Sequence, residues 1–154
     1  MAGRIAGKRT EGDYGGISHM IKVVFPYGIR FREDRHTEIF PAAELTVLGK
    51  NGKGLRAFFH IDSGATTTVL PMSDSFLLGI KIKTKKKVLV RGIAGNAAIG
   101  YPHTLTFQTE LIKFSAPVLF VDDNNVPRIL GREGIFSEFR ILFEEMDRRV
   151  SFFK

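Results

Sequence analysis

The segment 58–71 carries the residues best suited to chemistry. Its apolar run ends at Ile61 and is followed directly by Asp62, Ser63 and Gly64. A glycine permits a sharp turn and a close approach of the backbone, so the carboxylate would stand at the mouth of a strand. A carboxylate in that position is a candidate general acid or base. The triplet alone is a weak indication, because all three residue types also form ordinary turns.

A second motif lies 69 residues further along the chain and strengthens the first. Two apolar residues, Ile129 and Leu130, precede Gly131 and Arg132. Between the two motifs, the segment 92–95 reads Gly-Ile-Ala-Gly and is typical of a hairpin tip. The order of these three features points to one functional site rather than to separate turns.

Strands must position these motifs. From residue 20 onward, apolar or alternating segments are separated by turn residues, which is the pattern of a strand-rich domain. We expect strands at 21–25, 44–48, 55–61, 88–91, 97–101, 104–107, 111–114, 117–121, 140–143 and 148–153. Apolar residues at helical spacing in 132–139 predict a helix of about two turns. The sequence therefore predicts an all-β fold with one short helix near the C-terminus.

Composition limits the remaining possibilities. The chain has 154 residues, 44% of them hydrophobic, which suits one globular domain and excludes disorder as its main state. Cysteine is absent, which excludes disulfides, thiolate metal sites and cysteine nucleophiles. The longest uncharged apolar stretch, 116–121, is too short to cross a bilayer.

Residues 1–19 differ from the rest of the chain. They are glycine-rich, mixed in charge and without hydrophobic periodicity, and they run into Ser18-His19-Met20, which is similar to a cloning scar. We interpret 1–19 as a disordered tail derived from cloning, and 20–154 as the domain. The tail lacks the apolar core of a signal peptide, which slightly favours the cytoplasm. A trimmed signal or anchor would leave the same sequence, so the localisation stays open.

The motifs resemble those of the retropepsin-like aspartic protease family. The resemblance covers about residues 40 to 153, and the segments 44–70 and 129–153 are similar to bacterial single-domain members. It implies a closed acid-protease barrel. It also implies a homodimer, because each chain of this family supplies one catalytic aspartate, here Asp62. The sequence agrees, since it holds a single Asp-Ser/Thr-Gly motif.

The resemblance implies a mechanism as well. Two copies of Asp62 would share one proton, because like charges a few ångström apart cannot both ionise cheaply. The ionised aspartate would activate a water, and the protonated one would polarise the scissile carbonyl of an extended peptide. We expect no metal, no cofactor and no covalent intermediate.

Further roles carry over from the family. Ser63 and Gly64 would support the dyad, with Ser63 forming a hydrogen bond across the dimer, and Leu130 would pack in the core. The expected substrate-binding residues are Ala65, Thr66, Gly92, Ile93, Ala94, Gly95 and Ile129, of which 92–95 would form a flap tip. An ordinary hairpin turn is the alternative for the glycines. In viral members an acid two positions after the motif glycine pairs with the arginine of the second motif. Here Arg132 matches the arginine, but Thr66 stands at the position of the acid.

His60 and the lysine run need separate interpretations. Strand alternation places His60 on the same side as Asp62, where it either borders the cleft, is a satisfied core histidine or tunes the pH dependence. His36 and His103 stand at no ligand spacing to it, which disfavours a metal role. The net charge is +7, and alternating lysines in 80–87 suggest a strand with one solvated face. No aromatic residues interleave these lysines, so we expect no nucleic acid partner.

Three functions remain. We favour a homodimeric aspartic endopeptidase. The second is a catalytically weak or inactive domain of the same fold used for dimerisation or peptide binding. The third is a basic nucleic-acid-binding module based on 81–87. The carboxylate pairs at 144–145 and 122–123 lie beside turn residues and are interpreted as solvated loops. The C-terminal segment 150–153 either pairs with a partner copy or closes the core.

Overall fold

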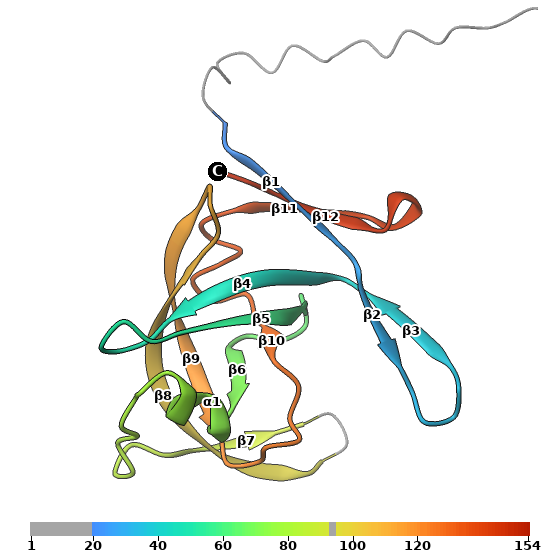
Figure 1. The fold of residues 1–154 in the computed structure, drawn as a ribbon. Helices are drawn as coiled ribbons and strands as arrows, with labels where there is room; N and C mark the ends of the chain where they lie inside the picture. The colour runs from blue at the N-terminus through green and yellow to red at the C-terminus, as the bar shows by residue number, and fades with distance from the viewer. Residues whose placement is uncertain (1–19, 93–94) are drawn as a thin grey trace, which may run out of the picture.

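The computed structural model describes residues 20–92 and 95–154, which form mostly strands (Figure 1). The strands are β1 (Lys22–Pro26), β2 (Gly28–Phe31), β3 (Thr37–Phe40), β4 (Ala42–Leu48), β5 (Gly54–Ile61), β6 (Thr68–Pro71), β7 (Val88–Arg91), β8 (Ala97–Gln108), β9 (Lys113–Val121), β10 (Ile129–Leu130), β11 (Arg140–Glu144) and β12 (Arg149–Phe153). One α-helix, α1 (Met72–Leu77), and one 3₁₀ turn, η1 (Glu145–Asp147), complete the described elements. The expectation of an all-β fold with one short helix is confirmed at this level.

A seven-stranded sheet holds both motifs. Its strand order is β4-β5-β10-β6-β9-β8-β7, and β4 also pairs with β8 over three residues, so the sheet curls strongly. Short β10 lies between β5 and β6, parallel to β5 and antiparallel to β6. This arrangement places the second motif directly beside the strand that leads into the first.

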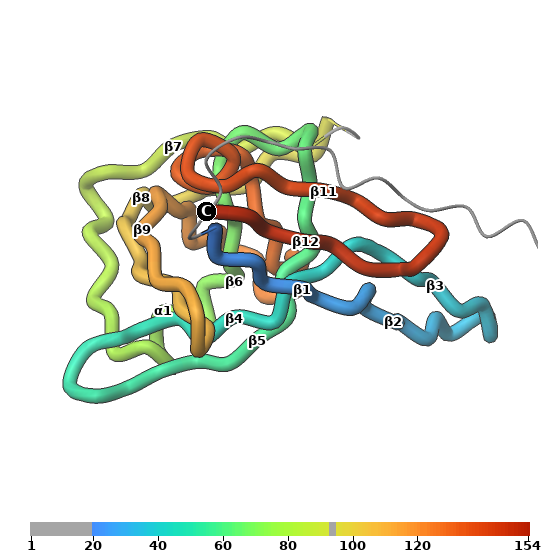
Figure 2. Tube along the Cα trace, turned by 90° about the horizontal axis from the view of Figure 1, so that it is seen from above, coloured from blue at the N-terminus to red at the C-terminus, as the bar shows by residue number. Residues whose placement is uncertain are grey.

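A three-stranded sheet of order β1-β12-β11 lies across the curled sheet, as the view from above shows (Figure 2). β12 is its central strand, paired antiparallel with β1 on one side and with β11 on the other. Both edges of β12 are therefore occupied within the chain. Of the two alternatives for the segment 150–153, the structure supports closure of the core, since Val150 and Phe152 are buried.

A series of contacts between phenylalanine rings connects the two sheets. Phe59 of β5 meets Phe107 at 5.5 Å between ring centroids, and Phe107 stacks on Phe114 at 5.3 Å. Phe114 in turn meets Phe139 at 5.1 Å, and Phe139 meets Phe152 of β12 at 5.6 Å. Burying such rings supplies most of the driving force for packing one sheet on another.

The predicted helix at 132–139 is wrong. The segment forms consecutive turns, in which the amides of Phe136 and Phe139 donate to the carbonyl oxygens four residues earlier. Gly134 has φ = +73°, a left-handed conformation that interrupts a right-handed helix. The α-helix lies instead at Met72–Leu77, directly after β6.

The strand expected around 80–87 is also absent, because no neighbouring strand pairs with this segment among the described residues. The side chains still alternate, with Ile80 buried and Lys81 exposed, so the alternation reflects packing rather than pairing in a β-sheet.

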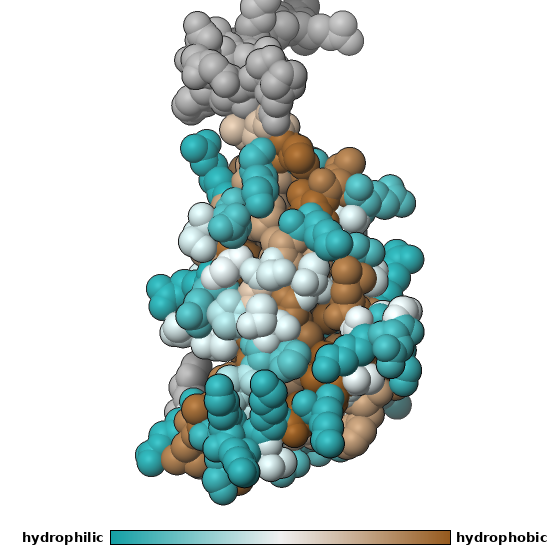
Figure 3. All heavy atoms as spheres, turned by 90° about the vertical axis from the view of Figure 1, so that its left-hand side faces the viewer, coloured by the Kyte–Doolittle hydropathy of each residue, from teal (hydrophilic) through white to brown (hydrophobic). Residues whose placement is uncertain are grey.

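Hydrophilic side chains dominate the face on the side of β8 and β9 (Figure 3). No helix within the described ranges is long and apolar enough to span a membrane.

Candidate functional site

The backbone holds Asp62 at the exit of β5. Its amide donates to the carbonyl oxygen of Leu130 at 3.1 Å, and its own carbonyl oxygen accepts from the amide of Ala65 at 3.2 Å. The carboxylate is held as well, because the amide of Gly64 donates to Asp62 Oδ1 at 2.8 Å. The side chain is half-buried, while Ser63 and Gly64 are exposed. Asp62 therefore presents an oriented carboxylate at an accessible turn.

The second motif crosses the first at van der Waals distance. The amide of Gly131 donates to Oγ1 of buried Thr68 at 3.1 Å. A Cβ atom at Gly131 would lie 2.5 Å from the carbonyl carbon of Thr67, which leaves room for glycine only. Position 131 thus requires glycine because another segment of backbone occupies the space of a side chain.

Two more backbone bonds continue this crossing. The amide of Arg132 donates to the carbonyl oxygen of Ala65 at 3.0 Å, and the amide of Glu133 to that of Thr66 at 2.9 Å. The Arg132 side chain is exposed and makes no ion pair with a described residue. The two motifs are therefore joined through main-chain hydrogen bonds. The ion pair of viral members is absent from the described residues, as expected from a threonine at position 66.

Of the substrate-binding residues predicted from the sequence, Ala65, Thr66 and Ile129 lie at this crossing. Ala65 and Ile129 are half-buried, and Thr66 is exposed. Ile129 pairs with His60 of β5 and with Val69 of β6. Leu130 is fully buried, in agreement with its interpretation as a core residue.

The glycine hairpin connects β7 and β8. The amide of Gly92 donates to the carbonyl oxygen of Asn96 at 3.1 Å, and that of Gly95 to the carbonyl oxygen of Gly92 at 3.0 Å. Gly95 has φ = +80°, and a Cβ atom there would meet nothing within 4 Å. Ile93 and Ala94, the proposed flap tip, lie outside the described residues. The hairpin itself is present, and its closure over Asp62 stays a prediction.

A partly buried ion pair, which no motif in the sequence indicated, fixes the approach to the second motif. Asp74 of α1 is fully buried, and it accepts hydrogen bonds from Nε and Nη2 of Arg128 at 2.6 and 2.7 Å. Hydrogen bonding to Asp74 raises the pKa of Arg128 further above its usual value. The carbonyl oxygen of Arg128 accepts from the amide of His60 at 2.9 Å. The pair thereby sets where β10 meets β5.

Beside this ion pair lies a cavity of about 270 Å³. Its lining includes Arg30, Phe40, His60, Ser73, Asn124 and Arg128. His60 is half-buried and packs against Phe40 with ring centroids 5.0 Å apart. Of the alternatives for His60, this geometry favours a pocket wall over a fully buried core histidine, and whether the pocket belongs to the substrate cleft stays a prediction. The described residues contain no group of three or more potential metal ligands.

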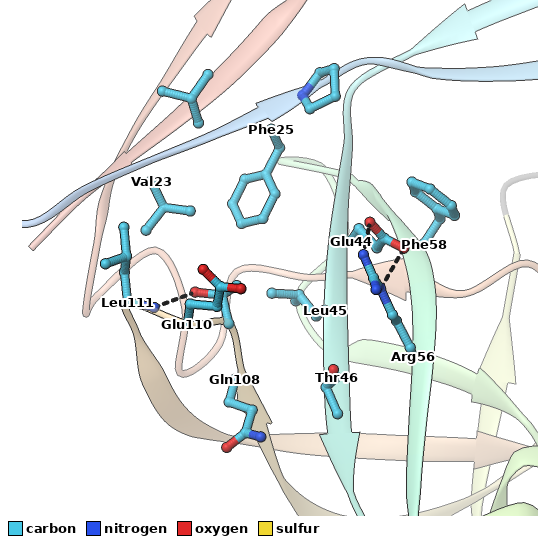
Figure 4. Close-up of a pocket in the computed structure, with 13 residues that line it drawn as sticks. Val23, Phe25, Glu44, Leu45, Thr46, Arg56, Phe58, Gln108, Glu110 and Leu111 are labelled. Carbon is cyan, nitrogen blue, oxygen red and sulfur yellow. Dashed lines mark hydrogen bonds and ion pairs between the residues drawn. The ribbon is translucent and has the colours of Figure 1, made fainter.

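A larger cavity of about 610 Å³ lies elsewhere, between β1, the outer side of β4 and β5, and the turn after β8 (Figure 4). Phe25, Phe58 and Leu111 contribute its apolar surface. Arg56 Nε donates to Glu44 Oε1 at 2.7 Å across its edge. Asp62 does not line this cavity.

The acidic pair 144–145 has structural partners, whereas Asp122 and Asp123 are exposed, as expected for a solvated loop. Glu144 accepts hydrogen bonds from Arg149 Nη2 at 2.6 Å and from Ser151 Oγ at 2.7 Å. These bonds lower the pKa of Glu144 from 4.5 to about 2. Glu145 accepts a hydrogen bond from the Tyr27 hydroxyl at 2.8 Å. Burial, together with this hydrogen bond, raises the pKa of Tyr27 to about 12. Glu144 is therefore part of a hydrogen-bonded network rather than a solvated loop.

Comparison with solved structures identifies the class of fold. The chain is similar to the crystal structure of a retropepsin-like aspartic protease from Rickettsia conorii, with a TM-score of 0.53 and 17% sequence identity. The match covers 91% of this chain and 96% of that one. No family profile and no curated protein sequence matches. At this identity the likeness establishes a retropepsin-like fold, and the chemistry has to be argued from the residues.

Proposed function

We propose that the protein is an aspartic endopeptidase that works as a homodimer, with one Asp62 from each copy. The observation that carries the proposal is the crossing of the two motifs. The Asp62 amide donates a hydrogen bond to the carbonyl oxygen of Leu130, and the Asp62 carboxylate accepts one from the amide of Gly64, so the side chain is oriented. The residue is only half-buried, so the carboxylate is accessible. The retropepsin-like fold of the Rickettsia conorii protease supports the same reading.

In the proposed dimer the two carboxylates share one proton and titrate as a unit. The ionised Asp62 removes a proton from a water, which attacks the carbonyl carbon of the scissile peptide bond. The protonated Asp62 polarises the carbonyl oxygen through a hydrogen bond and later transfers its proton to the leaving amine as the C–N bond breaks. The proton taken from the water stays on the other Asp62, so the pair again shares one proton. The Gly64 amide, which donates to Oδ1 at 2.8 Å, fixes the orientation of the carboxylate.

The remaining residues of the proposed site bind the substrate. Ser63 supports the dyad across the dimer, and Ala65, Thr66 and Ile129 contact an extended peptide. The hairpin 92–95 covers the peptide and excludes water. β4 pairs with both β5 and β8, and closure of this curled sheet into a barrel would fix the spacing between Asp62 and the hairpin.

Cleavage of a denatured protein mixture between pH 3 and pH 7 tests the proposal. Wild-type protein should cleave with an acidic optimum, and Asp62→Asn should be inactive. Asp34→Asn is the matched control, because Asp34 lies in the exposed β2–β3 turn. Equal results for wild type and Asp62→Asn, with both folded and dimeric, would replace catalysis by the non-catalytic peptide-binding role.

A further inference from the structure

The cavity of about 270 Å³ lies along the strand that presents Asp62. His60 of β5 lines it, and Asp62 follows two residues later at the exit of the strand, where strand alternation directs it to the same side as His60. Two residues of strand span about 7 Å, which is also the spacing of same-side residues in an extended peptide. Asp62 itself does not line the cavity. A peptide that runs along β5 with its scissile bond at Asp62 would place a neighbouring side chain there.

Arginines dominate the charge of the cavity. Arg30 of β2 and Arg128 of the segment before β10 both line it, and none of the described lining residues is acidic. Asp74 binds Arg128 from behind, and its side chain is only 1% exposed. Nη1 of Arg128 makes no hydrogen bond to a described residue. The ion pair thus holds the guanidinium rigid while one of its nitrogens stays unused.

Arg30 is also only weakly engaged. Its Nη1 lies 3.7 Å from Glu38 Oε2, beyond hydrogen-bonding distance. Glu38 is already bonded by Arg32, whose Nε and Nη2 donate to Oε2 at 3.2 and 3.1 Å. The Arg30 guanidinium rests over the Phe40 ring, 5.1 Å from its centroid. Cation–π contact fixes such a group without consuming its hydrogen-bond donors.

We propose that this cavity binds an acidic side chain of the peptide substrate, with Arg30 and Arg128 as the groups that recognise its carboxylate. The planar guanidinium matches a carboxylate better than any other side chain does. The substrate class is then a peptide with aspartate or glutamate close to the scissile bond. This inference rests on the proposed function, because it takes Asp62 as the position of the scissile bond.

Binding without turnover tests the inference separately from catalysis. Fluorescein-labelled nonapeptide pools are titrated with Asp62→Asn protein, and binding is measured by fluorescence polarisation. For each peptide position in turn, a pool with glutamate at that position is compared with an otherwise identical pool that has glutamine there. Hydrogen bonds to charged groups predict about tenfold tighter binding of the glutamate pool at one position. Arg30→Gln should remove most of this preference. Arg32→Gln is the matched control, since Arg32 shares Glu38 but does not line the cavity.

Arg128 is tested by the double variant Asp74→Asn/Arg128→Gln, in which an amide pair replaces the ion pair and no buried charge is left alone. It should also lose the preference. Equal binding of the glutamate and glutamine pools overturns the inference. A preference for glutamate that survives both Arg30→Gln and the double variant also overturns it. So does a preference that the control Arg32→Gln removes as fully as Arg30→Gln does. Asp62-dependent cleavage without acid preference would refute this inference alone. Acid preference without cleavage by wild type would refute the protease alone.

Discussion

The α-carbon of Gly131 packs directly on the backbone of Thr67, so closely that a Cβ atom would lie 2.5, 2.7 and 2.9 Å from the carbonyl carbon, carbonyl oxygen and amide nitrogen of Thr67. All three of these Thr67 atoms belong to the backbone, so they cannot rotate away as the end of a flexible side chain would. The contact joins the two motifs on which the proposed site depends.

Gly131→Ala should therefore push the second motif away from the first. We expect a loss of about 1–3 kcal/mol in the free energy of unfolding, as for overpacked cores. The loss of cleavage activity should exceed what the unfolded fraction explains. Urea unfolding followed by circular dichroism gives the stability. Gly54→Ala is the control, because its nearest neighbour would lie at 3.5 Å. Unchanged stability of Gly131→Ala would contradict the close approach.

The Asp74–Arg128 pair should respond unequally to loss of its two members. Arg128→Ala leaves a fully buried carboxylate without a partner, which costs about 3–5 kcal/mol. Asp74→Ala leaves a guanidinium that is 32% exposed and reaches water, so the cost should be smaller. Chemical denaturation of both variants checks the order. A larger loss for Asp74→Ala would show that Asp74 is less buried than described.

Neighbouring phenylalanines of β5 test the register of the strand that leads to Asp62. Phe59 is fully buried, whereas Phe58 is 57% exposed on the opposite face. Phe59→Ala should cost about 3–5 kcal/mol. Phe58→Ala should change stability by less than about 0.5 kcal/mol. The reverse order in thermal unfolding would mean that the strand is shifted by one residue, which would also turn Asp62 to the core.

Glu144 predicts a pH-dependent contribution to stability. Arg149 and Ser151 hold its pKa at about 2, below the ordinary value of 4.5. A lowered folded pKa stabilises the protein above about pH 4.5, and this stabilisation is lost as the pH falls towards about 2. Glu144→Gln should thus have a lower Tm than wild type at pH 7, with the difference closing on acidification. Glu110→Gln, at an exposed position, is the control. A difference in Tm that is constant with pH would contradict the assignment.

Mixing experiments test whether catalysis needs Asp62 from both copies. Wild type and Asp62→Asn are unfolded together in equal amounts and refolded at constant total concentration. Random pairing leaves about a quarter of the dimers with two intact aspartates, so activity should fall to about a quarter of the all-wild-type value. Activity of about one half would mean that each copy works alone with its own Asp62, and activity of about three quarters would mean that one aspartate per dimer suffices.

The strands were predictable where apolar residues alternate against a core. The segment 88–91 coincides with β7, and 55–61 with β5 apart from its first residue. Two expected strands, 97–101 and 104–107, are one strand, because Pro102 stands at an exposed position that does not interrupt β8. The hairpin β2–β3 was missed, since Phe31 and Ile39 are exposed and no buried face distinguishes these strands.

The candidate site was predictable only as far as local motifs reach. The sequence indicated that Asp62 and Gly131 belong together, and the structure joins them. Asp74 carried no such signal, because its partner Arg128 is distant in the chain and only the fold brings them together. The helix that holds Asp74 has six residues, too few to show a helical period.

The central position of β12 has a consequence for the order of folding. Ile21 and Lys154 exchange backbone hydrogen bonds of 2.8 and 2.9 Å, so the first described strand pairs with the last. During synthesis β1 must wait, unpaired, until residues 149–153 have emerged. Such distant pairings slow folding and expose strand edges in the meantime. Nascent chains should therefore remain open to chaperones and proteases until the final strand arrives.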